Sequence, residues 1–223
     1  MDLILIILPI VLILLSQAYI NTSYRKYSRV SVKSKLTGAS VARMILDKNG
    51  LNDVEVVKIS GELTDNFNPR TNVVSLSSEV YSGNSIASVA VAAHECGHVI
   101  QHKEKYAFIV LRSILVPVVN LTTNLGYIIM LIGIFASVFD MAMVGFIMMC
   151  ASLLFQLVTL PTEFNASKRG RNILLELNVI TNDELPYVKS MLNAAAMTYL
   201  ASFFASITQM LRLFLSINRN NRD

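Results

Sequence analysis

The chain has 223 residues, of which 53% are hydrophobic and only 15% are charged, and its mean hydropathy is +0.53. A soluble domain of this length is less apolar, so the composition excludes an ordinary soluble enzyme and predicts a multi-pass membrane protein. The net charge of +4 gathers at predicted membrane borders, and no DNA- or RNA-binding motif accompanies it. We therefore expect the lipid bilayer as a partner and no nucleic acid. Two cysteines, Cys96 and Cys150, indicate no disulfide framework.

Residues 1–20 are predicted to form an N-terminal transmembrane anchor. The run 3–20 carries no charge and is about as long as a bilayer is thick. The alternative is a cleaved signal peptide, with Ser16, Gln17 and Ala18 as the cleavage site, but no basic region precedes the apolar run. A basic cluster that resists translocation follows at once: Arg25, Lys26, Arg29, Lys33 and Lys35. We expect an uncleaved anchor with its N-terminus outside the cell.

Residues 21–110 are predicted to form a cytosolic, zincin-like α+β module. A short amphipathic helix over 40–49 ends at Gly50, and strands are expected at 54–59 and 73–76, separated by a polar loop over 61–69. We expect Val73–Ser77 to be an edge strand that pairs with an extended substrate, as edge strands do in zincins. A merely structural strand is the equally weighted alternative.

The helix that ends this module carries the most informative motif, His94-Glu95-Cys96-Gly97-His98. Positions four apart share one face of a helix, so His94 and His98 can bind one metal ion, and Glu95 lies close enough to activate a water on it. This HExxH layout is typical of zinc metallopeptidases. The alternative is an ordinary buried helix with two hydrogen-bonded histidines.

Three neighbouring residues refine this interpretation. Gly97 costs about 1 kcal/mol of helix stability relative to alanine, so we expect a close approach of backbone or substrate there. Cys96 points away from the histidine face and is not expected to bind the metal. His102 lies about 12 Å along the helix from His94, too far to share the ion.

Three further segments complete the predicted organisation. Residues 111–160 form a transmembrane hairpin whose turn lies at Asp140, and residues 161–190 form a helix and loop that carry the third metal ligand. Residues 191–223 form a C-terminal transmembrane or interfacial helix and tail. The sequence carries no signal of oligomeric state.

A catalytic zinc site needs a third protein ligand, and no further histidine is suitable. The acidic candidates after the motif are Glu104, Asp140, Glu163, Glu176, Asp183 and Glu184. Glu163 lies where the predicted hairpin returns to the side from which it left, close to the bilayer that the motif helix also approaches. This geometry selects Glu163. The alternative role for Glu163 is a charge at a helix N-terminus.

Several motifs together resemble the YugP-type neutral zinc metallopeptidases of bacterial membranes. They are the stretches 92–101, around His94 and His98, and 160–167, around Glu163, with 61–65 and Pro69-Arg70. The resemblance covers nearly the whole chain. It implies a gluzincin: one Zn²⁺ per chain held by His94, His98 and Glu163, with Glu95 as general base.

The chain departs from this family's pattern at a few positions near the motifs. Asn165 stands where the family usually has Asp, Asn66 where it often has His, and Asn68 where it often has Asp. Distant gluzincins place an Asp at the position of Ser167, where it orients a zinc histidine. Such partners can change metal affinity or activity ten- to a hundredfold.

The sequence thus predicts a mainly α, multi-pass membrane protein with a small α+β module containing the HExxH helix. We expect a zinc-dependent metalloendopeptidase of the cell membrane, with its active site on the cytoplasmic side and a protein or peptide substrate near the membrane. The alternative function is a catalytically weak or inactive zinc-binding scaffold. A transporter is disfavoured because no predicted span carries paired ionisable residues at mid-depth.

Overall fold

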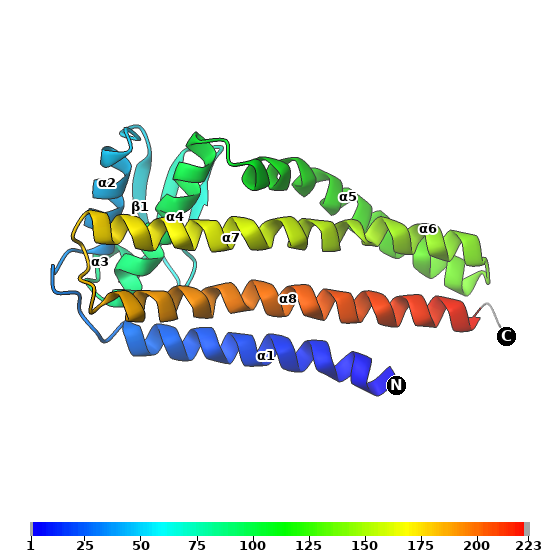
Figure 1. Cartoon of the computed structure of the whole chain (residues 1–223). Coiled ribbons are helices and arrows are strands. Elements are labelled where there is room, and N and C mark those ends of the chain that lie inside the picture. The colour runs from blue at the N-terminus through cyan, green and yellow to red at the C-terminus, as the bar shows by residue number, and fades with distance from the viewer. Residues whose placement is uncertain (1, 221–223) are drawn as a thin grey trace. The chain divides into compact units, whose positions relative to one another are not determined.

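The computed structural model describes residues 2–220, so Met1 and the last three residues of the predicted tail lie outside the described part. Eleven elements occur in chain order (Figure 1). They are α1 (Asp2–Tyr27), α2 (Gly38–Lys48), β1 (Glu55–Ile59), β2 (Asn66–Asn68), β3 (Val73–Ser77), α3 (Ser78–Ser82), α4 (Ile86–Lys103), α5 (Ala107–Phe135), α6 (Phe139–Met149), α7 (Ala151–Glu176) and α8 (Leu185–Asn220). The predicted fold class, mainly α with a small α+β module, is confirmed.

The chain forms two compact units. The first contains residues 1–17, 107–161 and 197–223, and the second contains residues 18–106 and 162–196. The second unit holds the whole sheet, the motif helix α4 and the part of α7 that follows Pro161. It is therefore the unit that builds the candidate site.

Among the described residues, four helical segments are long and apolar enough to cross a membrane: Leu3–Tyr27, Ala107–Phe135, Phe139–Glu176 and Leu185–Asn218. Within the first unit, α5 and α6 form a hairpin whose connection falls just before Asp140. Glycines allow the two helices to touch, since a Cβ added to Gly133 would lie 2.3 Å from the Ala142 backbone nitrogen. A Cβ on Gly145 would lie equally close to the backbone nitrogen of Met130.

The sheet of the second unit has the strand order β1-β3-β2, with β1 parallel and β2 antiparallel to β3. The prediction that Val73–Ser77 is an edge strand is therefore wrong, because this strand is the central one. Its neighbour β2 arises from the segment predicted to be a loop. Asp65 folds that segment back, since its carboxylate accepts hydrogen bonds from the Ser77 backbone N–H at 2.7 Å and from the Ser77 hydroxyl at 3.1 Å.

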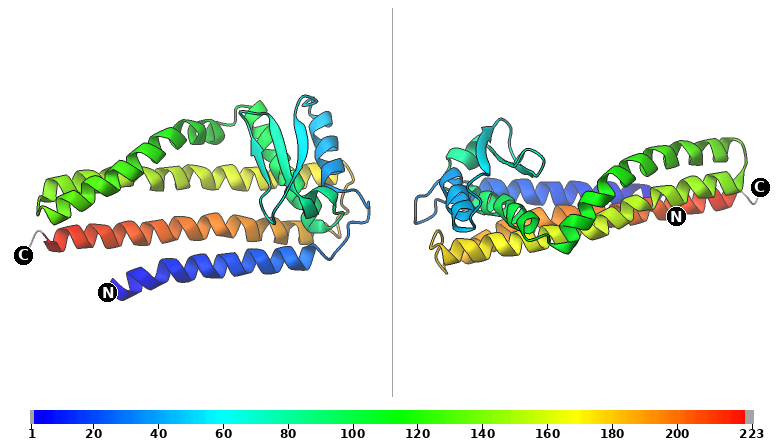
Figure 2. Two further views of the ribbon diagram at one scale, coloured as in Figure 1. Left: turned by 180° about the vertical axis from the view of Figure 1, so that it is seen from behind. Right: turned by 90° about the horizontal axis from the view of Figure 1, so that it is seen from above.

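Helices α2 and α4 pack beside the strands, which are drawn in cyan in both views of Figure 2. Val41 and Ile45 of α2 are fully buried, as are Ile86 and Val89 of α4 and Leu76 of β3. Their burial joins the helices and the sheet into one hydrophobic core. This core holds α4 in place, and the motif residues with it.

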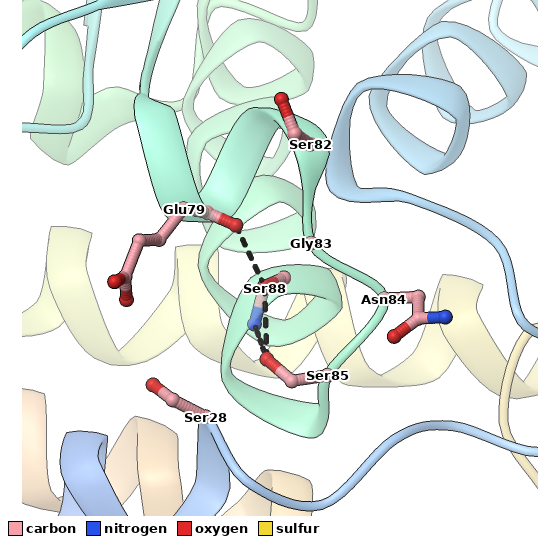
Figure 3. A pocket seen from close by; sticks show the side chains of 7 residues that line it. All are labelled: Ser28, Glu79, Ser82, Gly83, Asn84, Ser85 and Ser88. Atoms are coloured by element: carbon pink, nitrogen blue, oxygen red, sulfur yellow. Dashed lines mark hydrogen bonds between the residues drawn. The ribbon is translucent and has the colours of Figure 1, made fainter.

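The start of α4 borders a polar cavity of about 370 Å³ (Figure 3). Its lining residues are Ser28, Glu79, Ser82, Gly83, Asn84, Ser85 and Ser88. Ser85 caps the helix by accepting a hydrogen bond from the Ser88 N–H at 3.1 Å. A Cβ on Gly83 would lie only 2.3 Å from the Glu79 carbonyl oxygen, so this tight connection requires glycine. The Ser85 cap fixes where α4 begins, and the residues that line the cavity include none of the predicted metal ligands.

Candidate metal centre

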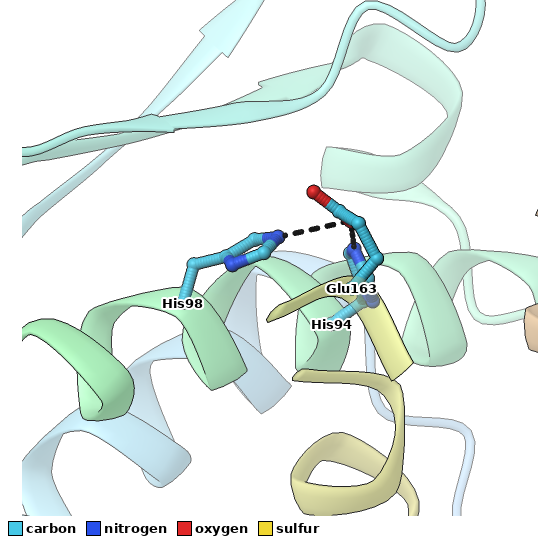
Figure 4. A group of neighbouring side chains, drawn as sticks. All are labelled: His94, His98 and Glu163. Carbon is cyan, nitrogen blue, oxygen red and sulfur yellow. Dashed lines mark ion pairs between the residues drawn. The ribbon is translucent and has the colours of Figure 1, made fainter. Parts of the chain in front are cut away.

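The structure brings His94, His98 and Glu163 together within the second unit (Figure 4). His94 and His98 lie one turn apart on α4, with their ring centroids 4.8 Å apart and their planes nearly perpendicular. Glu163 comes from α7, and its Oε2 atom lies 3.3 Å from His94 Nε2 and 3.4 Å from His98 Nε2. One candidate ligand atom from each residue lies within 4.8 Å of the others. The three side chains therefore face a common point.

Glycines bring α7 to this position by letting its backbone touch that of α4. A Cβ added to Gly97 would lie 2.6 Å from the Ala166 carbonyl oxygen. On the other helix, a Cβ on Gly170 would lie 2.8 Å from the Ala93 carbonyl oxygen. The glycine within the HExxH motif is thus explained by close backbone approach, one of the two reasons expected from the sequence.

Glu163 lies in the middle of a long helix, because α7 begins at Ala151. The alternative role as a charge at a helix N-terminus is therefore wrong. The residue is only 2% exposed, and a buried carboxylate is costly unless cationic or hydrogen-bonding groups surround it. The pKa of His98 reflects this contact: burial lowers it, but the hydrogen bond and charge of Glu163, together with the Glu95 charge and the Gln101 hydrogen bond, raise it above its usual value.

The other ring nitrogens of both histidines are held by neutral side chains. His94 Nδ1 lies 3.0 Å from Ser167 Oγ, and His98 Nδ1 lies 3.0 Å from Gln101 Oε1. Each ring therefore turns its Nε2 atom toward Glu163. Metal-binding histidines show this arrangement, with one nitrogen on the ion and the other on a hydrogen-bonding partner.

The donor set fits a zinc ion. Two imidazole nitrogens and a carboxylate oxygen are the ligands of many catalytic zinc sites, which keep a fourth position for water. Bonds of about 2.0–2.1 Å in a tetrahedron put ligand atoms roughly 3.3 Å apart, close to the two distances between imidazole and carboxylate.

Glu95 is the residue next to His94 on the same helix, and it is only 8% exposed. Burial raises the pKa of the Glu95 carboxyl, although the nearby imidazoles of His94 and His98 act in the opposite direction. A carboxylate whose pKa is raised is a stronger base, so it accepts a proton more readily near neutral pH. Its environment is chemically suited to a general base.

Cys96 and His102 lie outside the metal cluster, as the sequence indicates. The Cys96 thiol is fully buried, and its Sγ atom lies 3.7 Å from the Ala42 carbonyl oxygen of α2. Burial raises the pKa of this thiol, which disfavours the thiolate form that binds metal. The His102 ring packs edge-on against Phe67 of β2, with the centroids 5.5 Å apart.

Most of the other acidic candidates take part in structural contacts. Glu104 pairs with Arg169 at 2.6 Å, and Asp183 pairs with Lys33 at 3.2 Å. Glu176 pairs with Lys48, while Glu184 accepts a hydrogen bond from the Lys33 backbone N–H. Asp140 lies in the first turn of α6. Among the described residues, the metal cluster contains only Glu163 as its acidic member.

The motif pattern alone does not point to Gln101, which is fully buried beside His98. The available signal was its spacing, because a residue three positions after a helical histidine lies on the same face. Arg169 was also missed, since its link to the site depends on how α7 crosses α4. It donates a hydrogen bond to Asn165, one of the positions where the chain departs from the family pattern.

These features define a mainly helical protein with apolar helices long enough to span a bilayer and a His/His/Glu cluster able to hold a metal ion. The chain belongs to the family described as "Putative neutral zinc metallopeptidase", whose model matches residues 2–218. It is 42% identical over 208 residues to "Putative membrane protease YugP" of Bacillus subtilis (strain 168), covering 93% of this chain and 92% of that relative. No solved structure matches the chain. The resemblance drawn from the motifs is confirmed.

Proposed function

We propose that this protein is a membrane-embedded zinc endopeptidase of the gluzincin type, with one zinc ion held by His94, His98 and Glu163. The observation that carries the proposal is the convergence of these three side chains from two helices. Membership of a zinc metallopeptidase family supports the choice of metal and of reaction.

In the proposed reaction, bound zinc supplies a water of pKa about 7 and polarises the scissile carbonyl. Glu95 accepts the proton of that water and passes it to the leaving amine. Ser167 and Gln101 keep the two imidazoles turned toward the ion. The chemistry needs no covalent intermediate, so no nucleophilic serine or cysteine takes part.

The substrate is proposed to be an extended segment of a protein or peptide. Because β3 is central, the edge that remains beside α4 belongs to β2. Phe67 of β2 packs on His102, one turn of α4 beyond His98. Asn66 and Asn68 on either side of Phe67 are exposed. Main-chain pairing along this short edge would lay a peptide close to the metal centre.

The metal site is tested by measuring zinc in the purified protein and in Glu163→Ala. We expect about one zinc per chain in the wild type and strong loss in the variant, because two imidazoles alone bind zinc weakly. Glu176→Ala is a matched control, since Glu176 lies on the same helix and pairs with Lys48 outside the cluster. Glu163→Ala protein that keeps the wild-type zinc content would disprove the proposed site.

We propose that the protein crosses the membrane several times and that the metal centre faces the cytoplasm. Four apolar helical segments and similarity to a membrane protease support the membrane location. The basic cluster that follows the apolar part of α1 supports the orientation, because positively charged loops stay on the cytoplasmic side.

The orientation is tested with Ser34→Cys, which adds a thiol to an exposed position in the segment between α1 and α2. In whole cells, we expect no labelling by a maleimide that cannot cross the membrane, and full labelling after the cells are opened. The parent protein, with Cys96 and Cys150 unchanged, serves as the control. Labelling of intact cells at position 34 would place the metal centre outside.

A further inference from the structure

A chain of hydrogen bonds connects His98 to the α7 helix through Gln101. The Gln101 Oε1 atom lies 3.0 Å from His98 Nδ1. Its Nε2 atom donates to the Thr162 carbonyl oxygen at 2.8 Å and to Asn165 Oδ1 at 3.0 Å. Asn165 Oδ1 also accepts a hydrogen bond from Arg169 Nε at 2.6 Å. The Gln101 side chain is fully buried, so water does not compete for these partners.

At the α7 end of this chain of hydrogen bonds, Arg169 can only donate and the Thr162 carbonyl can only accept. The guanidinium of Arg169 can only donate, so the Asn165 atom that it contacts must be the oxygen. The carbonyl oxygen of Thr162 can only accept. The Gln101 atom that faces both acceptors must therefore be the amide nitrogen. Its oxygen then points at His98, which leaves no freedom to flip the amide.

The orientation of this amide determines which nitrogen of a neutral His98 ring carries the proton. An amide oxygen can only accept, so His98 Nδ1 must donate. The lone pair of the ring is then on Nε2, the atom that faces Glu163 at 3.4 Å. A neutral imidazole in this tautomer is ready to bind a metal ion through Nε2.

The partner of the other histidine does not impose such a choice. Ser167 Oγ, 3.0 Å from His94 Nδ1, is a hydroxyl that can either donate or accept. Gln101 is therefore the partner that determines a tautomer, and Arg169 with Asn165 and Thr162 determines how Gln101 is turned. Glu104 and the Tyr106 ring in turn hold the Arg169 guanidinium in place.

We propose that Gln101 is a positioning residue that holds His98 as the Nδ1–H tautomer and so prepares its Nε2 atom for the metal. This inference rests on the proposed zinc site and adds a residue that acts through His98 without touching the ion. The two amide atoms of Gln101 have different functions. The Oε1 atom serves metal binding, whereas the Nε2 atom joins α4 to α7.

The test compares Gln101→Met with Gln101→Glu in the full-length protein, purified in detergent. Gln101→Met removes the acceptor, so we expect zinc affinity, measured by chelator competition, to fall about 10- to 100-fold. The absorption spectrum of the Co²⁺-substituted protein should change with it, because the His98 ring is no longer held. Gln101→Glu keeps an acceptor for His98, so zinc affinity should not fall. Its second oxygen faces two acceptors, which should lower the melting temperature of the metal-free protein.

Gln156→Met is a matched control because it removes a glutamine that bonds to Ser206 in the first unit, and it should leave zinc affinity unchanged. If Gln101→Met does not fold, Gln101→Asn is the substitute, since its shorter side chain withdraws the oxygen from His98 and should also weaken zinc binding. If Gln101→Met, or Gln101→Asn in its place, folds and keeps the wild-type zinc affinity and Co²⁺ spectrum, the inference is overturned. An equal loss of affinity in Gln101→Glu would overturn it as well. His98→Ala separates the two proposals: if it keeps its zinc, the metal site itself is wrong.

Discussion

Glu95→Gln should abolish peptide hydrolysis while the zinc content stays at the wild-type level. The amide has nearly the same size and shape as the carboxylate but cannot take a proton from a metal-bound water. General-base catalysis contributes about 10²–10⁴-fold to the rate, so we expect a loss in that range or beyond measurement. The assay is cleavage of an unfolded test protein by zinc-loaded enzyme in detergent, with zinc measured in the same samples.

Retention of zinc is expected because Glu95 is not part of the metal cluster formed by His94, His98 and Glu163. Glu79→Gln provides a matched control, since it is the same chemical change at the exposed side chain of α3. Normal hydrolysis by Glu95→Gln would refute the proposed mechanism. A wild-type protein that binds zinc yet cleaves nothing in a broad peptide library would instead favour the zinc-binding scaffold.

The meeting of His94, His98 and Glu163 was predictable from the sequence because it depends on helical periodicity and on the order of the apolar segments. Helical periodicity alone puts His94 and His98 on one face. The choice of Glu163 needed only the predicted transmembrane hairpin, which returns at this residue to the side of the membrane that the motif helix approaches. The backbone contact at Gly97 could also be anticipated, since an interior glycine weakens a helix unless something needs the space.

The parts that could not be predicted depend on contacts between distant residues. The position of β3 inside the sheet was missed because it depends on Asp65 bonding to Ser77, which turns an Asn-rich loop into the neighbouring strand β2. The role of Gln101 was missed for a similar reason. Its partners Thr162 and Asn165 lie more than sixty residues away, and their positions depend on the rotation of α7 about its own axis.

Gly97→Ala should weaken zinc binding more than it weakens the fold. The added methyl carbon would lie 2.6 Å from the Ala166 carbonyl oxygen, so α4 and α7 must move apart. Overpacking costs about 1–3 kcal/mol, whereas alanine regains about 1 kcal/mol of helix propensity, so the net loss of stability is modest. Glu163 lies one turn before Ala166 on α7 and moves with it. Metal–ligand distances in proteins lie within about 0.2 Å of their usual values, and a displaced Glu163 would fall outside that range, so we expect zinc affinity to fall tenfold or more.

Gly50→Ala is the control that separates the two effects, with zinc affinity and thermal unfolding measured on both variants. Gly50 has a φ of +64°, where alanine is strained by about 1–2 kcal/mol, but an added Cβ would meet only the end of the Lys103 side chain at 3.8 Å. We expect this variant to lose stability and to keep its zinc. If Gly97→Ala also kept wild-type zinc affinity, the contact between the α4 and α7 backbones would not determine the position of Glu163 relative to His94 and His98. The geometry of the metal centre would then tolerate a wider separation of α4 and α7 than their close packing implies.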